Sequence, residues 1–206
     1  MTMQTLRFAG KIVSLAAAIA LSATIGQAAQ DEKEVFTVHA VNMSGAGRSG
    51  TTTFTITIDR WSSVEERNLL LTTLKEKGHD EFIKALRAQK QVGFVRGHLP
   101  SAVRGPSIRL QYAFQSVEDG QREITLVTNR PISAAEAMSA GKSLDYDTSI
   151  VRMQFPAEEG GDKKVQGKGS LYRAVKVGFS EKTGHLDAEV VGNEAVRLTD
   201  IRSEKK

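Results

Sequence analysis

The chain has 206 residues, of which 28 are Lys or Arg and 24 are Asp or Glu, and it contains no cysteine. The lack of cysteine excludes disulfides, thiolate metal sites and a lipid attached through an N-terminal cysteine, so stability must come from a hydrophobic core. The formal net charge of +4 has no concentrated Lys/Arg cluster behind it, which argues against nucleic acid as a partner.

The first 28 residues have the three parts of a secretory signal peptide. Arg7 and Lys11 give a positive start, residues 12–23 form an apolar run too short to span a bilayer, and small residues lead up to Ala28. We expect cleavage after Ala28 and a periplasmic or secreted protein. The alternative is an uncleaved membrane anchor. No later segment is apolar enough to span, so no transmembrane segment is expected in the mature chain.

Two strands are predicted at the start of the mature chain, over residues 34–43 and 51–59. Apolar and polar residues alternate in both segments, and this period of two is typical of half-buried strands. In the first strand, Phe36, Val38 and Ala40 share one face, and Val35, Thr37, His39 and Val41 share the other. In the second strand, Phe54, Ile56 and Ile58 alternate with Thr53, Thr55 and Thr57.

The period then changes, and a unit of two helices is predicted over about residues 62–90. Ser63 and Glu66 form a capping-box pattern, Gly78 is placed to end the first helix, and the second begins at Asp80. Trp61 is expected to pack on this unit as a hydrophobic staple. The apolar stripe of the pair requires a cover, and a sheet face is the only large candidate. Its members are Leu70, Leu71, Leu74, Phe82, Ile83 and Leu86.

From residue 91 onward the pattern is β again. Further strands are predicted over 92–97, 107–115, 122–129, 144–155 and 194–202, together with a hairpin over 170–192 that turns at 182–184. A helical turn is predicted within 131–141, and residues 156–169 are predicted to be a loop or an irregular edge. In residues 107–115 the side chains of Ile108, Leu110, Tyr112 and Phe114 are expected on one face.

These elements predict an α+β fold for residues 29–206, as a single domain. About eight or nine strands joined by short turns indicate a large antiparallel sheet, partly closed as a barrel or folded as a sandwich, with the two-helix unit inserted.

Two phosphate-binding patterns fail on their context. Gly45, Gly47 and Gly50 spell G-x-G-x-x-G, but a strand follows where a dinucleotide site requires a helix. Residues 140–143 read AGKS, and Glu136 stands where the phosphate loop needs glycine. No cofactor is therefore predicted.

The four histidines are His39, His79, His98 and His185. They lack the spacing of zinc ligands, and a surface or turn location is expected for each. Asp145 and Asp147 share one face of a predicted strand, which suits acid–base chemistry or calcium, although solvation is the simpler interpretation.

Aromatic residues offer one further candidate site. Tyr112 and Phe114, with Arg109 nearby, could line a ligand cavity, and the alternative is ordinary core packing. No catalytic, cofactor-binding or metal-binding residue is assigned.

Three segments, IDRWSSVEERNLLLTTLKEKG, DGQREITLVTNRPIS and KSLDYDTSIVRMQF, make the chain resemble a family of exported bacterial proteins without an assigned activity. The resemblance implies export and a single domain, and it transfers no site residues.

We expect a non-enzymatic binding or accessory protein that holds an apolar or amphipathic ligand, or an envelope protein, between sheet and helices. The alternatives are a purely structural envelope protein and a hydrolase-like enzyme in which His39 or His98 meets Asp145 or Asp147 only in three dimensions.

Overall fold

The computed structural model of the protein describes residues 33–42, 50–98, 104–118, 120–130, 132, 146–156, 166–181, 183–189 and 195–205. In chain order the elements are β1 (Glu34–Asn42), β2 (Gly50–Ile58), α1 (Val64–Ala88), β3 (Gly93–His98), β4 (Arg104–Leu110), β5 (Tyr112–Glu118), β6 (Gln121–Thr128), β7 (Ser149–Phe155), β8 (Gln166–Tyr172), β9 (Lys176–Ser180), β10 (His185–Glu189) and β11 (Val196–Lys205).

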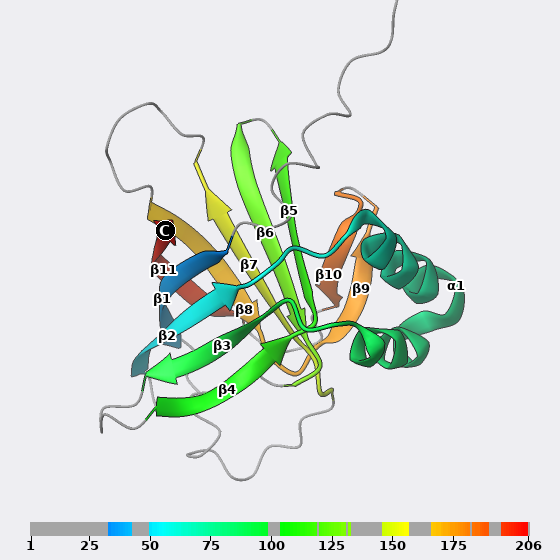
Figure 1. The fold of residues 1–206 in the computed structure, drawn as a ribbon, viewed down its shortest axis with the longest axis horizontal. Helices are drawn as coiled ribbons and strands as arrows, with labels where there is room; N and C mark the ends of the chain where they lie inside the picture. The colour runs from blue at the N-terminus through cyan, green and yellow to red at the C-terminus, as the bar shows by residue number, and fades with distance from the viewer. Residues whose placement is uncertain are drawn as a thin grey trace, which may run out of the picture.

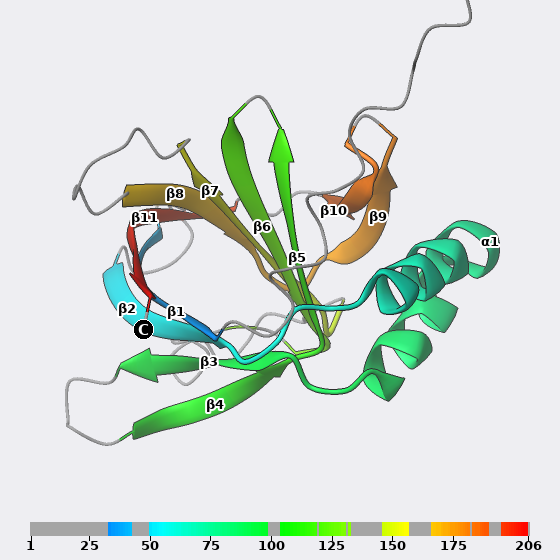
Figure 2. The ribbon, with the colours of Figure 1, turned by 45° about the horizontal axis from the view of Figure 1, so that its top comes forward.

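Nine of these strands form one sheet in the order β4-β3-β2-β1-β11-β8-β7-β6-β5, and every pairing is antiparallel. The sheet curls into a nearly closed barrel (Figures 1 and 2). Its two edge strands, β4 and β5, follow one another in the chain with Gln111 between them. The backbone N–H of Gln111 donates to the carbonyl of Val127 on β6 at 3.1 Å, which brings the two edges together at this end. The predicted antiparallel α+β architecture is confirmed at this level.

Gln111 also corrects the prediction of a single strand over residues 107–115. Ile108 and Leu110 belong to the barrel interior, whereas Tyr112 and Phe114 lie in a second cluster outside it. A bend at Gln111 reverses the phase, and Gln111 holds it by donating from Nε2 to Asn129 Oδ1 at 2.9 Å while Oε1 accepts the Asn129 N–H at 3.2 Å.

The barrel interior is filled by side chains. The alternation predicted for β1 and β2 is confirmed, because the face of Phe36, Val38 and Ala40 and the face of Phe54, Ile56 and Ile58 both lie inside the barrel, at most 3% exposed. The rings of Phe36 and Phe155 meet across the interior with centroids 5.7 Å apart. The interior cluster comprises Phe36, Val38, Ala40, Phe54, Ile56, Ile58, Trp61, Val92, Val95, Leu110, Ala113, Ile124, Leu126, Ile132, Val151, Met153, Phe155, Leu171, Val196, Leu198 and Ile201.

Trp61 belongs to this interior, which corrects its expected role as a staple on the helix. The Arg122 guanidinium lies over its ring, 5.6 Å from the centroid. Arg122 also donates to both oxygens of Glu34, at 3.1 and 2.7 Å, and to Gln115 Oε1 at 2.8 Å. Glu34 is only 4% exposed, so this is a buried ion pair with its hydrogen bonds satisfied.

The segment predicted as two helices is assigned as one helix, α1, with a kink at Gly78. The predicted capping box is present, because the Glu66 N–H donates to Ser63 Oγ at 3.2 Å and the Ser63 N–H donates to Glu66 Oε2 at 2.9 Å. Gly78 has φ +80° and ψ −173°, a conformation open essentially to glycine alone. The break lets the two arms of α1 lie at an angle (Figure 2).

α1 and a separate two-stranded sheet, β9–β10, lie against the outside of the barrel beside β5 and β6 (Figures 1 and 2). Between these elements is a second hydrophobic cluster, made of Leu70, Leu71, Leu74, Phe82, Leu86, Tyr112, Val127, Ile150, Val175, Val177 and Leu186. The apolar stripe of the helix therefore covers a sheet face, as its sequence predicted.

Strand β8 includes residues 166–169, which belong to the segment predicted as a loop or an irregular edge, and also residues 170–172, which were predicted to start the following hairpin. Its glycines serve packing: a Cβ at Gly167 would lie 2.6 Å from the Phe155 ring, and one at Gly169 would overlap the Arg152 carbonyl oxygen. The hairpin expected over 170–192 is present as β9–β10. The helical turn expected within 131–141 lies outside the described residues, apart from Ile132.

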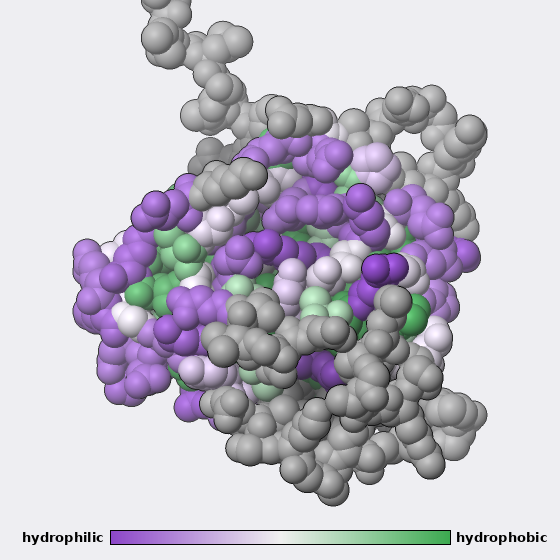
Figure 3. All heavy atoms as spheres, turned by 180° about the vertical axis from the view of Figure 1, so that it is seen from behind, coloured by the Kyte–Doolittle hydropathy of each residue, from purple (hydrophilic) through white to green (hydrophobic). Residues whose placement is uncertain are grey.

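On the side opposite to that of Figure 1, the described residues that are visible in Figure 3 form no large continuous apolar area. Hydrophilic residues predominate there, and the hydrophobic ones lie in separate patches (Figure 3). Within the described ranges, no helix combines the length and the hydropathy needed to cross a membrane.

Candidate functional site

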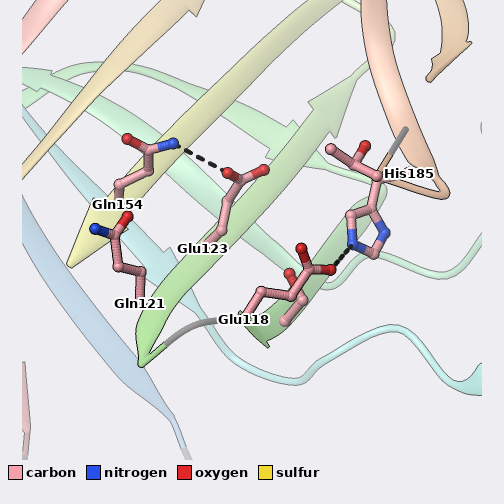
Figure 4. A pocket seen from close by; sticks show the side chains of 7 residues that line it. Glu118, Gln121, Glu123, Gln154 and His185 are labelled. Carbon is pink, nitrogen blue, oxygen red and sulfur yellow. Dashed lines mark hydrogen bonds and ion pairs between the residues drawn. The ribbon is translucent and has the colours of Figure 1, made fainter. Parts of the chain in front are cut away.

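A concave pocket lies on the outer face of β5, β6 and β7, beneath the start of β10 (Figure 4). Its volume is about 260 Å³. All the side chains that line it are polar or charged: Ser116, Glu118, Gln121, Glu123, Gln154, Thr183 and His185. This polar lining distinguishes the pocket from both hydrophobic clusters.

Strand register explains why these residues meet. Ser116 on β5 stands opposite Glu123 on β6, and Glu123 stands opposite Gln154 on β7, so the three form a row across the sheet. Glu118 stands opposite Gln121 in the same hairpin. Gln154 Nε2 donates to Glu123 Oε2 at 3.1 Å, which orients that carboxylate.

His185 closes the pocket from the β10 side. Its Nε2 lies 3.8 Å from Glu118 Oε1, and its ring centroid lies 5.3 Å from that of Phe114 (Figure 4). Burial, reinforced by the positive charge of Arg67, lowers the pKa of His185, so the imidazole is neutral at pH 7. Arg67 Nη2 lies 3.3 Å from Nδ1 and can only donate, which assigns the ring proton to Nε2, on the side of Glu118.

Two arginines hold the walls of the pocket without entering its lining. Arg67 on α1 donates to the Gly184 carbonyl at 2.8 Å and lies over the Phe114 ring at 4.6 Å. Arg152 Nη2 lies 3.1 Å from Asp187 Oδ1, while its Nε is 3.9 Å from Glu123 Oε1. Glu123 is therefore partly compensated, whereas Glu118 pairs with no Lys or Arg in the described part of the chain.

This set of hydrogen-bond acceptors suits the binding of an organic cation. Two carboxylates, two side-chain amides and two hydroxyl groups can accept hydrogen bonds from an ammonium or guanidinium group. Among the described residues, no group of three or more His, Cys, Asp or Glu side chains is arranged to hold a metal ion.

Of the two candidate acids, Asp147 is the one that the structure describes, and its ion pair there is with an arginine rather than a histidine. Asp147 is exposed and lies 3.6 Å from Arg87 Nη2 on α1. Asp145 lies outside the described residues, and so does the side chain of His98 at the end of β3. Gly45, Gly47, Glu136 and residues 140–143 also fall outside them.

His39 lies on the outer face of β1, where its neighbours on adjacent strands are Thr53 and Asp200. Its Nδ1 is 2.9 Å from Thr53 Oγ1, and its Nε2 is 3.6 Å from Asp200 Oδ2. Hydrogen bonds from Arg202 lower the pKa of Asp200. The His39 side chain is 36% exposed, so this trio sits on an open surface.

His79 helps to attach α1 to strand β9. Its Nδ1 accepts the backbone N–H of Val177 on β9 at 3.1 Å, and its ring meets that of Tyr146 edge-on at 5.2 Å. Burial lowers the pKa of His79.

Tyr112 and Phe114 are packed between sheet and helix, while Arg109 is exposed on β4. Burial raises the pKa of Tyr112, whose hydroxyl lacks a hydrogen-bond partner in the described structure. For these two aromatic residues, core packing is the interpretation that holds.

The pocket itself was missed from the sequence, although part of it had a signal. The β5–β6 hairpin places Ser116, Glu118, Gln121 and Glu123 on one face, whereas the predicted strands, 107–115 and 122–129, include only Glu123 of these four. His185 was expected at a surface or turn position. It directly follows the β9–β10 turn, but it is only 9% exposed, because α1 folds over the tip of β9–β10.

Comparison of the chain with protein-family models, with curated proteins and with solved structures finds no significant match. The resemblance to a family of exported bacterial proteins therefore stays a prediction.

Proposed function

We propose that this protein is an exported, non-enzymatic binding protein, and that it binds a ligand carrying an ammonium or guanidinium group in the pocket beside β10. The observation that carries the proposal is Glu118, a carboxylate at the pocket that faces the neutral imidazole of His185 and pairs with no Lys or Arg among the described residues. A bound cation would supply that partner through charge-assisted hydrogen bonds.

A polar ligand fits better than the apolar ligand expected from the sequence. The space between the sheet and α1 is occupied by the second hydrophobic cluster, and the barrel interior by the first. Apolar pockets that bind small molecules are lined mainly by hydrophobic side chains, whereas this pocket is lined by polar ones.

The test is calorimetric titration with n-butylammonium and n-butylguanidinium, with n-butanol as the uncharged comparison. We expect both cations to bind, n-butanol not to bind, and Glu118→Gln to weaken binding by about tenfold or more, because a hydrogen bond to a charged group is worth about 1.5–3 kcal/mol.

Glu76→Gln is the matched control, because it removes one negative charge from α1 outside the pocket lining. It should leave binding unchanged. Equal losses in the two variants would reduce the effect to net charge, and cation affinity that is unaffected by Glu118→Gln would place the site elsewhere.

Export is supported by the leader sequence. Expression of the full chain in a bacterium, followed by intact-mass measurement, should yield a protein that begins at Ala29. Arg7→Glu combined with Lys11→Glu should leave the leader uncleaved and the protein in the cytoplasm. Cytoplasmic accumulation of the uncleaved wild-type chain would overturn this part of the proposal.

The rival function is hydrolysis, and the trio of Thr53, His39 and Asp200 is the observation that favours it. A hydroxyl, an imidazole and a carboxylate in sequence resemble the order of a nucleophile, a base and an orienting acid. Turnover of activated esters that is abolished by Thr53→Val but not by Thr52→Val would favour this rival over binding.

A further inference from the structure

The pocket adjoins the edge of β5 that pairs with no other strand in the described structure. This strand pairs with β6 on one side, and it is the last strand of the nine-stranded sheet. On its other side, the Ser62 N–H donates to the Ala113 carbonyl at 2.9 Å, and the Ala113 N–H donates to Ser62 Oγ at 3.1 Å. Ser62 thus occupies the edge at one position.

The edge beyond Ala113 follows from antiparallel geometry. Backbone groups along a strand point alternately to its two sides, and the register of β5 with β6 is regular. Because Ala113 points away from β6, Gln115 and Val117 also direct their N–H and C=O groups outward. In the described structure, the hydrogen bonds between Ser62 and Ala113 are the ones that the backbone of β5 makes on the side away from β6. An unpaired edge of this kind is a template for another strand.

We propose that the ligand of the pocket is an extended polypeptide segment, which adds to this edge as an antiparallel strand and places a Lys or Arg side chain beside Glu118. The proposal rests on the cation site of the proposed function and names its ligand class. Main-chain hydrogen bonds to Gln115 and Val117 supply part of the affinity, and alternate side chains supply specificity.

The two faces of the sheet give the recognised pattern. Ser116 and Glu118 line the pocket on the outer face, so ligand residues beside them are basic. Val117 points to the opposite face and is 60% exposed, so the ligand residue beside it is apolar. The segment therefore reads basic–apolar–basic, in accordance with the period of two of a strand.

The test uses acetyl-Thr-Lys-Val-Lys-Thr-amide and the same peptide with N-methylvaline, measured by calorimetry on the mature protein. N-methylation removes the donor that faces Val117 and leaves the protein untouched. We expect the first peptide to bind at least tenfold more tightly than acetyl-lysine-amide, N-methylation to remove that gain, and Glu118→Gln to weaken both ligands.

On the protein side, Val117→Pro removes an outward N–H while sparing the β5–β6 hydrogen bonds, and Val117→Ala is its control. The proline variant should lose the peptide gain and retain the binding of acetyl-lysine-amide. Equal binding of the two peptides would overturn strand addition and leave the cation site intact. Absence of binding by acetyl-lysine-amide and by both peptides would overturn both proposals.

A second copy of this chain is the other occupant that the edge could take. A dimer in native mass spectrometry that dissociates in Val117→Pro but persists in Val117→Ala would assign the edge to self-association and overturn the peptide proposal.

Discussion

At the scale of single residues, two histidines link protonation to the attachment of α1 and the β9–β10 hairpin, which together form the outer layer of the molecule. His79 joins α1 to β9, and His185 joins the tip of the β9–β10 hairpin to Arg67 and Phe114. Burial is the main cause that lowers the pKa of each. Both are therefore neutral in the folded protein at pH 7, and both resist protonation as the pH falls.

This arrangement predicts stability that declines in mild acid. Because each folded-state pKa lies below the value of about 6.5 in the unfolded chain, the unfolded chain binds protons first. The free energy of unfolding should be highest above pH 6.5 and should fall as the pH drops below it. Urea unfolding at pH 7.5, 6.5 and 5.5 measures the slope.

His185→Gln and His79→Gln should each flatten that slope, since glutamine does not titrate. Asp and Glu residues contribute their own slope at lower pH, so the comparison belongs between pH 5.5 and 7.5. An unchanged slope in the double variant would show that these histidines do not carry the effect.

The buried pair of Glu34 and Arg122 predicts a second residue-scale result. Arg122→Leu leaves a carboxylate that is 4% exposed without its partner, so the free energy of unfolding should fall by about 3–5 kcal/mol. The combined Glu34→Gln and Arg122→Leu change should cost less than Arg122→Leu alone. Chemical denaturation measures both.

Lys33 and Asp59 supply the exposed counterpart, with their charged atoms 3.0 Å apart and side chains 59% and 43% exposed. Lys33→Ala should change stability by less than about 1 kcal/mol. A similar cost for the exposed and the buried pair would contradict the argument that burial makes Glu34 depend on Arg122.

At the scale of elements, the kink in α1 predicts a strict requirement for glycine. Gly78 has φ +80°, and an added Cβ there would meet no atom within 4 Å, so Gly78→Ala tests backbone conformation without a steric clash. The free energy of unfolding should fall by about 1–3 kcal/mol. Glu76→Ala, two residues earlier on the same helix, should be nearly neutral. A neutral Gly78→Ala would show that the two arms do not need this angle.

Element boundaries show how far the sequence could predict this fold. Periodicity identified β1, β2 and the helical segment, since each buries one face and its pattern follows directly. It failed at Gln111, because a single bent residue shifts the phase without changing the composition. It failed again at Gly167 and Gly169, which read as a loop or an irregular edge although they are required where β8 passes close to Phe155 and to the backbone of β7.

The candidate site was less predictable than the fold. Its β5–β6 part follows from a hairpin visible in the sequence, but Gln154 and His185 join it through strand register and through the position of β10. These are long-range contacts, and a local pattern carries no information about them. Trp61 was misplaced for the same reason, since its partner Arg122 is distant in sequence.

At the scale of the whole molecule, the two faces of one sheet contribute side chains to both hydrophobic clusters. β5, β6 and β7 bury Ile124 and Val151 inside the barrel and Val127 and Ile150 beneath the outer layer. Among the described strands, β9 and β10 pair with each other and with no third strand, and an isolated two-stranded hairpin is marginally stable. The stability of the outer layer therefore depends on side-chain packing against the barrel, whereas the barrel strands are also joined to one another by a continuous ladder of backbone hydrogen bonds.

Hydrogen exchange under native conditions should therefore separate the two parts. Amides of β9 and β10 should exchange through a partial opening of lower free energy than those of β1 and β11. Leu186→Ala should accelerate exchange in the hairpin and leave β1 unchanged. Identical opening free energies across both parts would mean that the molecule unfolds as one cooperative unit.

The position of β11 has a consequence for biosynthesis. Glu34 stands opposite Lys205, and β8 has its second neighbour only when β11 arrives. Synthesis must therefore reach β11 before β1 and β8 can be joined through it and the sheet can become continuous. Until then, a nascent chain contains two separate groups of strands, β4-β3-β2-β1 and β8-β7-β6-β5, and the unpaired edges of β1 and β8 are open to pairing with other chains.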